Sequence, residues 1–287
     1  MRQRVITGIL FVFVILAFAV PGFWWPQAIV LMMSVIGIMG TRELVLAVRA
    51  KALDTGWFFP FLGVATSLIP LFVSLFSSSL HWAFSIYAII TMGFSIITVI
   101  LVVIFHKKDM AFPDGVAAAG ILLYVSLPMA SANLLVLFLE KGWFFFVLGI
   151  ASPWISDVFA FFTGVLIGKH KIVPRISPKK TWEGCIGGAV MCGVVTALYF
   201  AFVVVPALEM KESVWISVLF GAALGVFLSV VSQLGDWMAS SIKRWTGIKD
   251  FGKILPGHGG ILDRFDSAFF TLPVTFGMIL LFMKARI

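Results

Sequence analysis

Long apolar runs, separated by short polar segments, fill almost the whole chain. A helix needs about 20 apolar residues to cross roughly 30 Å of hydrocarbon, and these runs lack the strict alternation of a barrel strand. The pattern therefore predicts nine transmembrane helices joined by short connections. The expected spans are residues 5–24, 27–48, 57–76, 82–105, 116–139, 143–167, 184–206, 214–236 and 267–283.

The composition agrees with an all-α, polytopic integral membrane protein. Of the 287 residues, 61% are hydrophobic and 12% are charged, whereas charged residues make up roughly a quarter of ordinary soluble domains. These values exclude a soluble globular enzyme and a disordered protein. Two cysteines, Cys185 and Cys192, are too few for a disulfide-stapled secreted domain, and we interpret them as small core residues.

The basic residues predict the orientation in the membrane. The chain has 21 Lys and Arg against 13 Asp and Glu, which gives a net charge of +8. If the N-terminus is cytoplasmic, all basic residues fall in cytoplasmic segments except Lys141, Lys211, Lys284 and Arg286. Residues 1–20 also resemble a signal peptide, but a retained first span fits this topology better. The positive surplus suggests the anionic cytoplasmic leaflet first and a phosphorylated substrate second.

Polar residues that topology does not require gather in the second half of the chain. We therefore expect residues 1–140 to form a helical scaffold and residues 141–287 to carry the catalytic motifs. The first such residue is Asp157, in the middle of the sixth span. A carboxylate at that depth is costly unless it faces a polar cavity or a partner, so Asp157 either lines a site or makes a structural hydrogen bond.

A second polar segment covers residues 177–184. Ser177 followed by Pro178 is typical of a helix start, which would put Lys179 and Lys180 in the first helical turn. The helix dipole disfavours cations at that end, so two tolerated lysines suggest that an anion binds there. Backbone amides, the dipole and two ammonium groups would form a phosphate site. The alternative is positive-inside charge without a ligand.

A third and longer polar segment covers residues 235–266. If the eighth helix continues beyond Asp236, then Ser240 and Lys243 follow on the same helix face. Asp263 and Asp266 are three residues apart and would lie on one side of the next helix. Carboxylates without thiolates are hard oxygen ligands that suit Mg²⁺, and the neighbouring basic residues suit a polyphosphate.

The glycines of this segment favour close approach of the backbone to a ligand. Gly259 and Gly260 follow His258, and such a loop can point N–H groups at an anion. His258 alone could cap, bind phosphate or act as an acid. The alternative, a juxtamembrane loop that binds lipid headgroups, does not explain the acidic residues. A Ser-His-Asp arrangement is absent from the pattern, so nucleophilic hydrolysis is not supported.

At these residues the sequence resembles the phosphatidate cytidylyltransferases, also called CDP-diacylglycerol synthases. Residues 177–184 look like the second motif of that family, and Asp157 matches its intramembrane aspartate. The C-terminal signature of the family is matched at Ser240, Lys243, Arg244, Lys249, Asp250, Gly252, Pro256, His258, Gly259, Gly260, Asp263, Arg264 and Asp266. The resemblance covers residues 150–287 well, and residues 1–140 match only as generic spans.

The resemblance implies a nine-span, Mg²⁺-dependent enzyme of the inner (plasma) membrane that converts CTP and phosphatidate to CDP-diacylglycerol and pyrophosphate. Its active site would face the cytoplasm, its metal ligands would match Asp236 and Asp263, and a second, monovalent or divalent, cation is left open. Lys243, Arg244 and Asp157 complete the expected catalytic set. Expected phosphate-binding residues are Ser177, Lys179, Lys180, Thr181, Lys249, His258, Gly259, Gly260 and Arg264. Supporting residues behind them are Ser240, Glu183, Asp250 and Asp266.

The expected partners are CTP, phosphatidate and membrane lipids, without nucleic acid, and a homodimer is left open. Two rival enzymes also use CTP in a membrane: a polyprenol kinase, and a cytidylyltransferase that acts on an archaeal-type ether lipid. A rival of another class is a transporter in which Asp157 binds a coupling ion. Transporters often contain repeated halves, and this sequence has no visible repeat.

Overall fold

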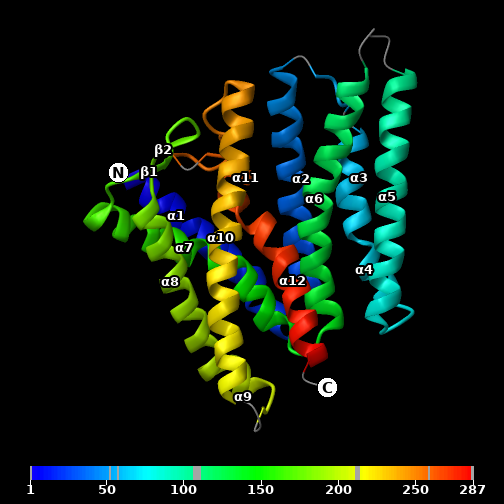
Figure 1. Ribbon diagram of the computed structural model, residues 1–287. Helices are drawn as coiled ribbons and strands as arrows, with labels where there is room; N and C mark the ends of the chain where they lie inside the picture. The colour runs from blue at the N-terminus through cyan, green and yellow to red at the C-terminus, as the bar shows by residue number, and fades with distance from the viewer. Residues whose placement is uncertain are drawn as a thin grey trace. The chain divides into compact units, whose positions relative to one another are not determined.

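The computed structural model describes residues 2–51, 53–56, 58–105, 111–210, 214–257 and 259–285. Almost all of this chain is helical (Figure 1). Six described helices are long and apolar enough to cross a membrane. They are Gln27–Arg49, Leu80–Phe105, Phe112–Phe138, Gly142–Ile167, Trp182–Ala207 and Val214–Thr246. Three shorter apolar helices cover Thr7–Phe23, Phe58–Ser74 and Ala268–Lys284. The fold is thus that of an all-α membrane protein.

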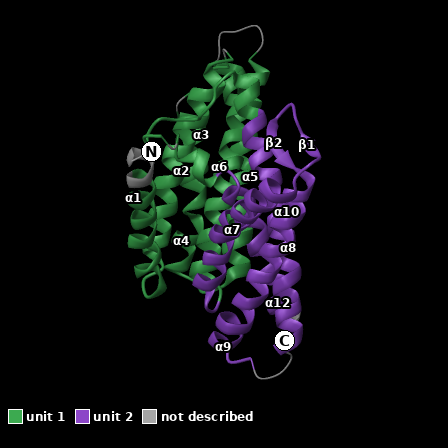
Figure 2. Ribbon diagram, turned by 90° about the vertical axis from the view of Figure 1, so that its left-hand side faces the viewer, with its two compact units in different colours: residues 1–139, 242–265 green, residues 140–241, 266–287 purple. Residues whose placement is uncertain are grey.

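The chain forms two compact units, coloured separately in Figure 2. Unit 1 comprises residues 1–139 and 242–265, and unit 2 comprises residues 140–241 and 266–287. The segment 242–265, which carries most of the C-terminal signature, therefore packs with the N-terminal helices. The expectation that residues 1–140 serve only as scaffold remains a prediction.

Unit 1 is built around α6 (Phe112–Phe138), which packs against α2 (Gln27–Arg49), α3 (Phe58–Ser67) and α5 (Leu80–Phe105). Unit 1 also contains α1 (Arg2–Ala19), η1 (Pro21–Phe23), α4 (Ile69–Ser74) and α11 (Leu262–Phe265). Small residues allow the helices to approach, as is usual in membranes. A Cβ added at Gly63 of α3 would lie 2.5 Å from the carbonyl oxygen of Leu122 in α6. The hydroxyls of Thr66 and Ser126 join the same two helices at 2.8 Å.

Unit 2 contains α7 (Gly142–Ile167), the hairpin β1 (Lys171–Val173) and β2 (Ser177–Thr181), α8 (Trp182–Tyr199), η2 (Phe200–Val204), α9 (Val205–Ala207), α12 (Ala268–Ala285) and most of α10 (Val214–Thr246). The two strands are antiparallel and pair Lys171 with Thr181. Helix α7 packs extensively against α8 and also contacts α12. The Ser156 and Ser229 hydroxyls of α7 and α10 lie 2.6 Å apart. Helices α7, α8 and α10 together line one cavity, described below.

Several predicted spans differ from the helices in detail. The third span is two helices, because Pro70 in the first turn of α4 cannot continue the ladder of α3. The seventh contains the π-helical turn η2 and continues through α9 to Ala207. The eighth does not end at Asp236 but continues to Thr246, as the placing of Ser240 and Lys243 on one face requires. Asp263 and Asp266 do not share one helix, because α11 ends at Phe265 and α12 begins at Ala268.

The predicted helix start at Ser177 is wrong. Residues Ser177–Thr181 form strand β2, so Lys179 and Lys180 precede the helix rather than occupy its first turn. The helix cap is Thr181, whose hydroxyl accepts a hydrogen bond from the Gly184 amide at 3.2 Å. A short edge strand tolerates a proline such as Pro178. Thr181 as the cap and Glu183 in the first turn favour a helix that starts at Trp182.

Candidate active site

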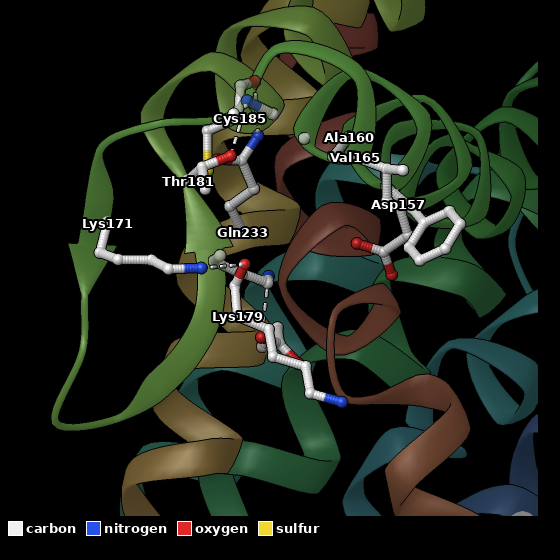
Figure 3. A pocket seen from close by; sticks show the side chains of 14 residues that line it. Asp157, Ala160, Val165, Lys171, Lys179, Thr181, Cys185 and Gln233 are labelled. Atoms are coloured by element: carbon white, nitrogen blue, oxygen red, sulfur yellow. Dashed lines mark hydrogen bonds and ion pairs between the residues drawn. The ribbon is translucent and has the colours of Figure 1, made fainter.

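Unit 2 contains a cavity of about 490 Å³ beside the hairpin, lined by the second half of α7, the start of α8 and the interior of α10 (Figure 3). Its polar lining residues are Asp157, Lys171, Lys179, Lys180, Thr181, Gln233 and Asp236. The sequence predicted five of these seven residues as members of the site. Lys171 and Gln233 were missed, because a hairpin lysine and a single glutamine within an apolar span carry no motif.

An ion pair joins the two sides of this cavity. The Lys180 ammonium on β2 lies 2.8 Å from the Asp236 carboxylate on α10, and both side chains are about a quarter exposed. Lys180 also attracts the Asp157 carboxylate, whereas Asp236 repels it. Asp157 is accessible from the cavity. Asp236 therefore pairs directly with the ammonium, and Asp157 interacts with both charges only through their electrostatic fields.

The lysines of the hairpin are held in place by backbone contacts. The Lys171 ammonium donates to the carbonyl oxygen of Lys179 at 3.4 Å, which ties β1 to β2 (Figure 3). The turn before β1 is fixed by Glu183, whose carboxylate accepts from the amides of Lys169 and His170. Nδ1 of His170 lies 2.6 Å from the same carboxylate. Glu183 therefore supports the hairpin and is not directed at a phosphate.

The signature segment in unit 1 forms a second network, centred on Asp263. Oδ1 lies 2.8 Å from the Lys243 ammonium, and Oδ2 accepts from the amides of Phe251 and Gly260 at 2.8 and 2.9 Å. Asp263 is 6% exposed and Lys243 is 15% exposed. The ammonium also lies 5.3 Å from the centre of the Phe251 ring. This network closes the loop before α11 and fixes the direction of both charged side chains.

Glycines in the loop are required by close approach. Gly259 has a φ of +87°, and a Cβ there would lie 2.8 Å from Oδ2 of Asp263. A Cβ at Gly260 would collide with the carboxylate of Glu43. The absence of a side chain at Gly259 and Gly260 thus lets the carboxylates of Asp263 and Glu43 lie close to the backbone. The Gly260 amide donates to Asp263, and the predicted role of this loop in binding a substrate phosphate stays a prediction.

Glu43 was missed by the sequence analysis, which treated the first half of the chain as chemically quiet. It lies on α2 and is 2% exposed. Its two oxygens accept hydrogen bonds from the amides of Ile261 and Leu262 at 3.0 and 2.8 Å. These amides belong to the residue before α11 and to its first residue, so the carboxylate caps this short helix and places Asp263. The signal in the sequence was a glutamate inside an apolar span.

Beside this network lies a basic pocket of about 490 Å³ on the signature loop. Its lining includes Lys249, Asp250, Lys253, Leu255 and Arg264. Three of the five are cationic and face the pocket from one short stretch of chain. Such a pocket suits a phosphate group.

The other predicted site residues take various places. Arg244 is exposed near the end of α10, and Ser240 is half-buried on the same helix. Asp266, which follows α11 in the chain, is buried, and its Oδ1 accepts from the Ser267 amide at 2.7 Å. His258 lies outside the described residues. Ser177 begins β2.

Asp236 in unit 2 and Asp263 in unit 1 each carry the hard carboxylate oxygens that Mg²⁺ prefers. Within the described ranges, no group of three or more His, Cys, Asp or Glu side chains lies together as metal ligands do. Mg²⁺ usually keeps several waters and binds through one or two carboxylates plus substrate phosphates, so fewer protein ligands suffice. Asp236 meets Lys180 through Oδ2. The Oδ1 of Asp263, which accepts from Lys243, retains a lone pair for a metal.

Comparison with known proteins places the chain in a class. The cytidylyltransferase family model matches residues 2–282, so the chain belongs to the cytidylyltransferase family.

Curated relatives narrow the class. The chain is similar to the phosphatidate cytidylyltransferase of Staphylococcus haemolyticus (strain JCSC1435), with 46% identity over 121 residues, or 42% of this chain and 43% of the relative. It is also similar to that of Staphylococcus aureus (strain COL), with 44% identity over 135 residues, or 47% and 48% of the two chains. The chain thus matches about half the length of these relatives.

Proposed function

We propose that this protein transfers the cytidylyl group of CTP to phosphatidate, which yields CDP-diacylglycerol and pyrophosphate. The observation that carries the proposal is the cavity of unit 2, in which Lys180 pairs with Asp236 beside Asp157, in a chain of the cytidylyltransferase family. The names of the curated relatives support phosphatidate as the acceptor. The unbroken signature from Ser240 to Asp266 supports the same assignment.

The proposed reaction needs no protein nucleophile. An oxygen of the phosphatidate phosphate bonds to the α-phosphorus of CTP, while the bond from that phosphorus to the bridging oxygen of the β-phosphate breaks. Pyrophosphate leaves with the electron pair. The protein therefore has to position two anions and neutralise their charge. The cationic side chains of the cavity and of the basic pocket suit that task.

The lysines act by exchanging partners. Lys180 leaves Asp236 for a phosphate oxygen when a substrate enters, and Lys179, accessible in the cavity, joins it. Lys243 is held by Asp263 close to Arg244 at the end of α10, and Lys249 and Arg264 line the basic pocket. Asp157 orients Lys180 electrostatically. Each role is a matter of charge neutralisation, so loss of one cation should weaken binding and turnover together.

Mg²⁺ would be held by Asp236 and Asp263, as the family resemblance predicts, and a second cation stays open. When bound, it would screen the charge of the CTP phosphates. Both carboxylates have an ammonium partner, Lys180 for Asp236 and Lys243 for Asp263. Lys180 and Lys243, which pair with these carboxylates, are the cations that would reach substrate phosphates. A metal titration that leaves activity unchanged would remove this part of the proposal.

The membrane topology is also proposed. Nine spans, a cytoplasmic N-terminus and a cytoplasmic active site follow from the distribution of Lys and Arg. The six long and three shorter apolar helices are compatible with that number. The bacterial relatives favour the plasma membrane. Single cysteines at Lys51 and Lys141, modified by an impermeant maleimide in intact cells, should give opposite accessibility.

The function is tested with purified protein, phosphatidate vesicles and CTP that is labelled at either the α- or the γ-phosphate. Label from the α-phosphate should appear in the lipid fraction, pyrophosphate should be released, and both should require Mg²⁺. Label from the γ-phosphate in the lipid would instead identify a kinase, and no labelled lipid would refute the proposal. Lys51→Ala, at the exposed end of α2, is the matched control for Lys180→Ala.

A further inference from the structure

An apolar groove runs between α1 and α2 in unit 1. It has a volume of about 260 Å³, and its lining is hydrophobic apart from Thr7. Helix α1 contributes Leu10, Phe11, Val14, Ile15 and Phe18, and helix α2 contributes Met32, Val35, Ile36 and Met39. Both sets follow helical spacing, so each helix turns one face to the groove. The two helices contact each other but do not fill the space between these faces.

The signature loop closes one part of this groove. Leu255, Ile261 and Phe265 belong to the lining, and the rings of Phe265 and Phe11 lie 5.7 Å apart. Leu255 also lines the basic pocket that contains Lys249, Lys253 and Arg264. The same loop thus presents cations on one side and apolar side chains on the other, with Leu255 common to both.

We propose that the groove binds one acyl chain of the phosphatidate substrate while the basic pocket binds its phosphate. This inference rests on the proposed function and deepens it, because it assigns the lipid to the signature loop of unit 1. An anionic headgroup next to a hydrocarbon chain is the chemistry that an adjoining cationic pocket and apolar groove match. Glu43, which fixes Ile261 and Leu262, would hold the border between the two.

The groove would orient the acyl chain of phosphatidate more than it would strengthen the binding of the lipid. An acyl chain that moves from the bilayer into the groove leaves one apolar environment for another, so little hydrophobic free energy is gained. What changes is the direction of the chain, which places the phosphate at Lys249 and Arg264. Blocking the groove should therefore raise the apparent KM for phosphatidate roughly threefold to tenfold, since the displaced chain can still rest in bulk lipid.

Two pairs of exposed positions give matched variants. Val14 and Val35 line the groove, whereas Val12 and Leu31 lie on the same helices outside it. Their exposed fractions are 45%, 44%, 53% and 55%, so tryptophan at any of them leaves the buried core untouched. Val14→Trp and Val35→Trp should raise the KM for phosphatidate, expressed as mole fraction in mixed micelles, and should leave the KM for CTP near wild type. Val12→Trp and Leu31→Trp should change neither. If a groove variant and the control variant on the same helix raised the KM for phosphatidate equally, the proposal would be overturned.

A second experiment uses the wild-type protein without turnover. Phosphatidate with a photoreactive diazirine in one acyl chain is irradiated with the full-length protein in nanodiscs, and the labelled peptides are mapped. Labelling of residues 7–18 and 32–39, reduced by excess phosphatidate but not by phosphatidylcholine, supports the proposal. Equal competition by both lipids would show that the groove binds any membrane lipid, which would overturn the proposal. Because this readout needs no CTP, substrate-selective labelling in a protein without cytidylyl transfer would refute the proposed function and leave the groove assignment standing.

Discussion

Glu43 offers the sharpest test of how unit 1 supports the signature loop. Its carboxylate is the acceptor for two amides, those of Ile261 and Leu262. A buried amide without a partner costs about 1–3 kcal/mol, so Glu43→Ala should destabilise the loop by about 2–6 kcal/mol. Glu43→Gln keeps one acceptor oxygen, and its NH₂ group cannot replace the other. We therefore expect about half of that loss, or about 1–3 kcal/mol.

Hydrogen exchange measures this directly. Because about 1.4 kcal/mol corresponds to a tenfold change in an equilibrium, the peptide that contains Ile261 and Leu262 should exchange roughly fivefold to 150-fold faster in Glu43→Gln. The kcat for cytidylyl transfer should fall with it, because Asp263 follows these amides directly. Lys51→Gln removes an exposed charge just beyond the end of α2 and should change neither property. Wild-type exchange and turnover in Glu43→Gln would refute the idea that this carboxylate holds the loop.

Three further outcomes are expected. Asp236→Asn should lower kcat at least about a hundredfold at saturating Mg²⁺ while the protein stays membrane-inserted, and activity near wild type would remove Asp236 from the metal site. Thr181→Ala should lower the stability of α8 by about 1 kcal/mol, whereas Thr181→Ser, which retains the cap, should melt like wild type. Gly225→Leu should lower the melting temperature more than Gly277→Leu, because a Cβ at Gly225 would lie 2.5 Å from the Cys192 carbonyl oxygen and one at Gly277 meets nothing within 4 Å.

The helices could be predicted from the sequence because hydrocarbon leaves few alternatives to an apolar helix. The face that carries Asp236, Ser240 and Lys243 could also be predicted, since it depends only on helical period. Residues 177–181 could not, because Ser-Pro favours a helix start locally and the pairing with β1 overrides it. Glu43 could not be assigned a partner, because no local rule connects residues so far apart in the chain.

The order of synthesis gives the Glu43 contact a further consequence. Its hydrogen-bond partners follow 218 and 219 residues later in the chain. At about 5–20 residues per second, α2 exists for roughly 10–40 s before those partners emerge from the ribosome. During that interval the Glu43 carboxylate has no amide donors to accept from. Hydration is then the state of lowest free energy for this acidic side chain in an apolar segment. We therefore expect α2 to stay near water during translation and to settle only after the loop arrives. The unit that begins first along the chain would then be the one completed late.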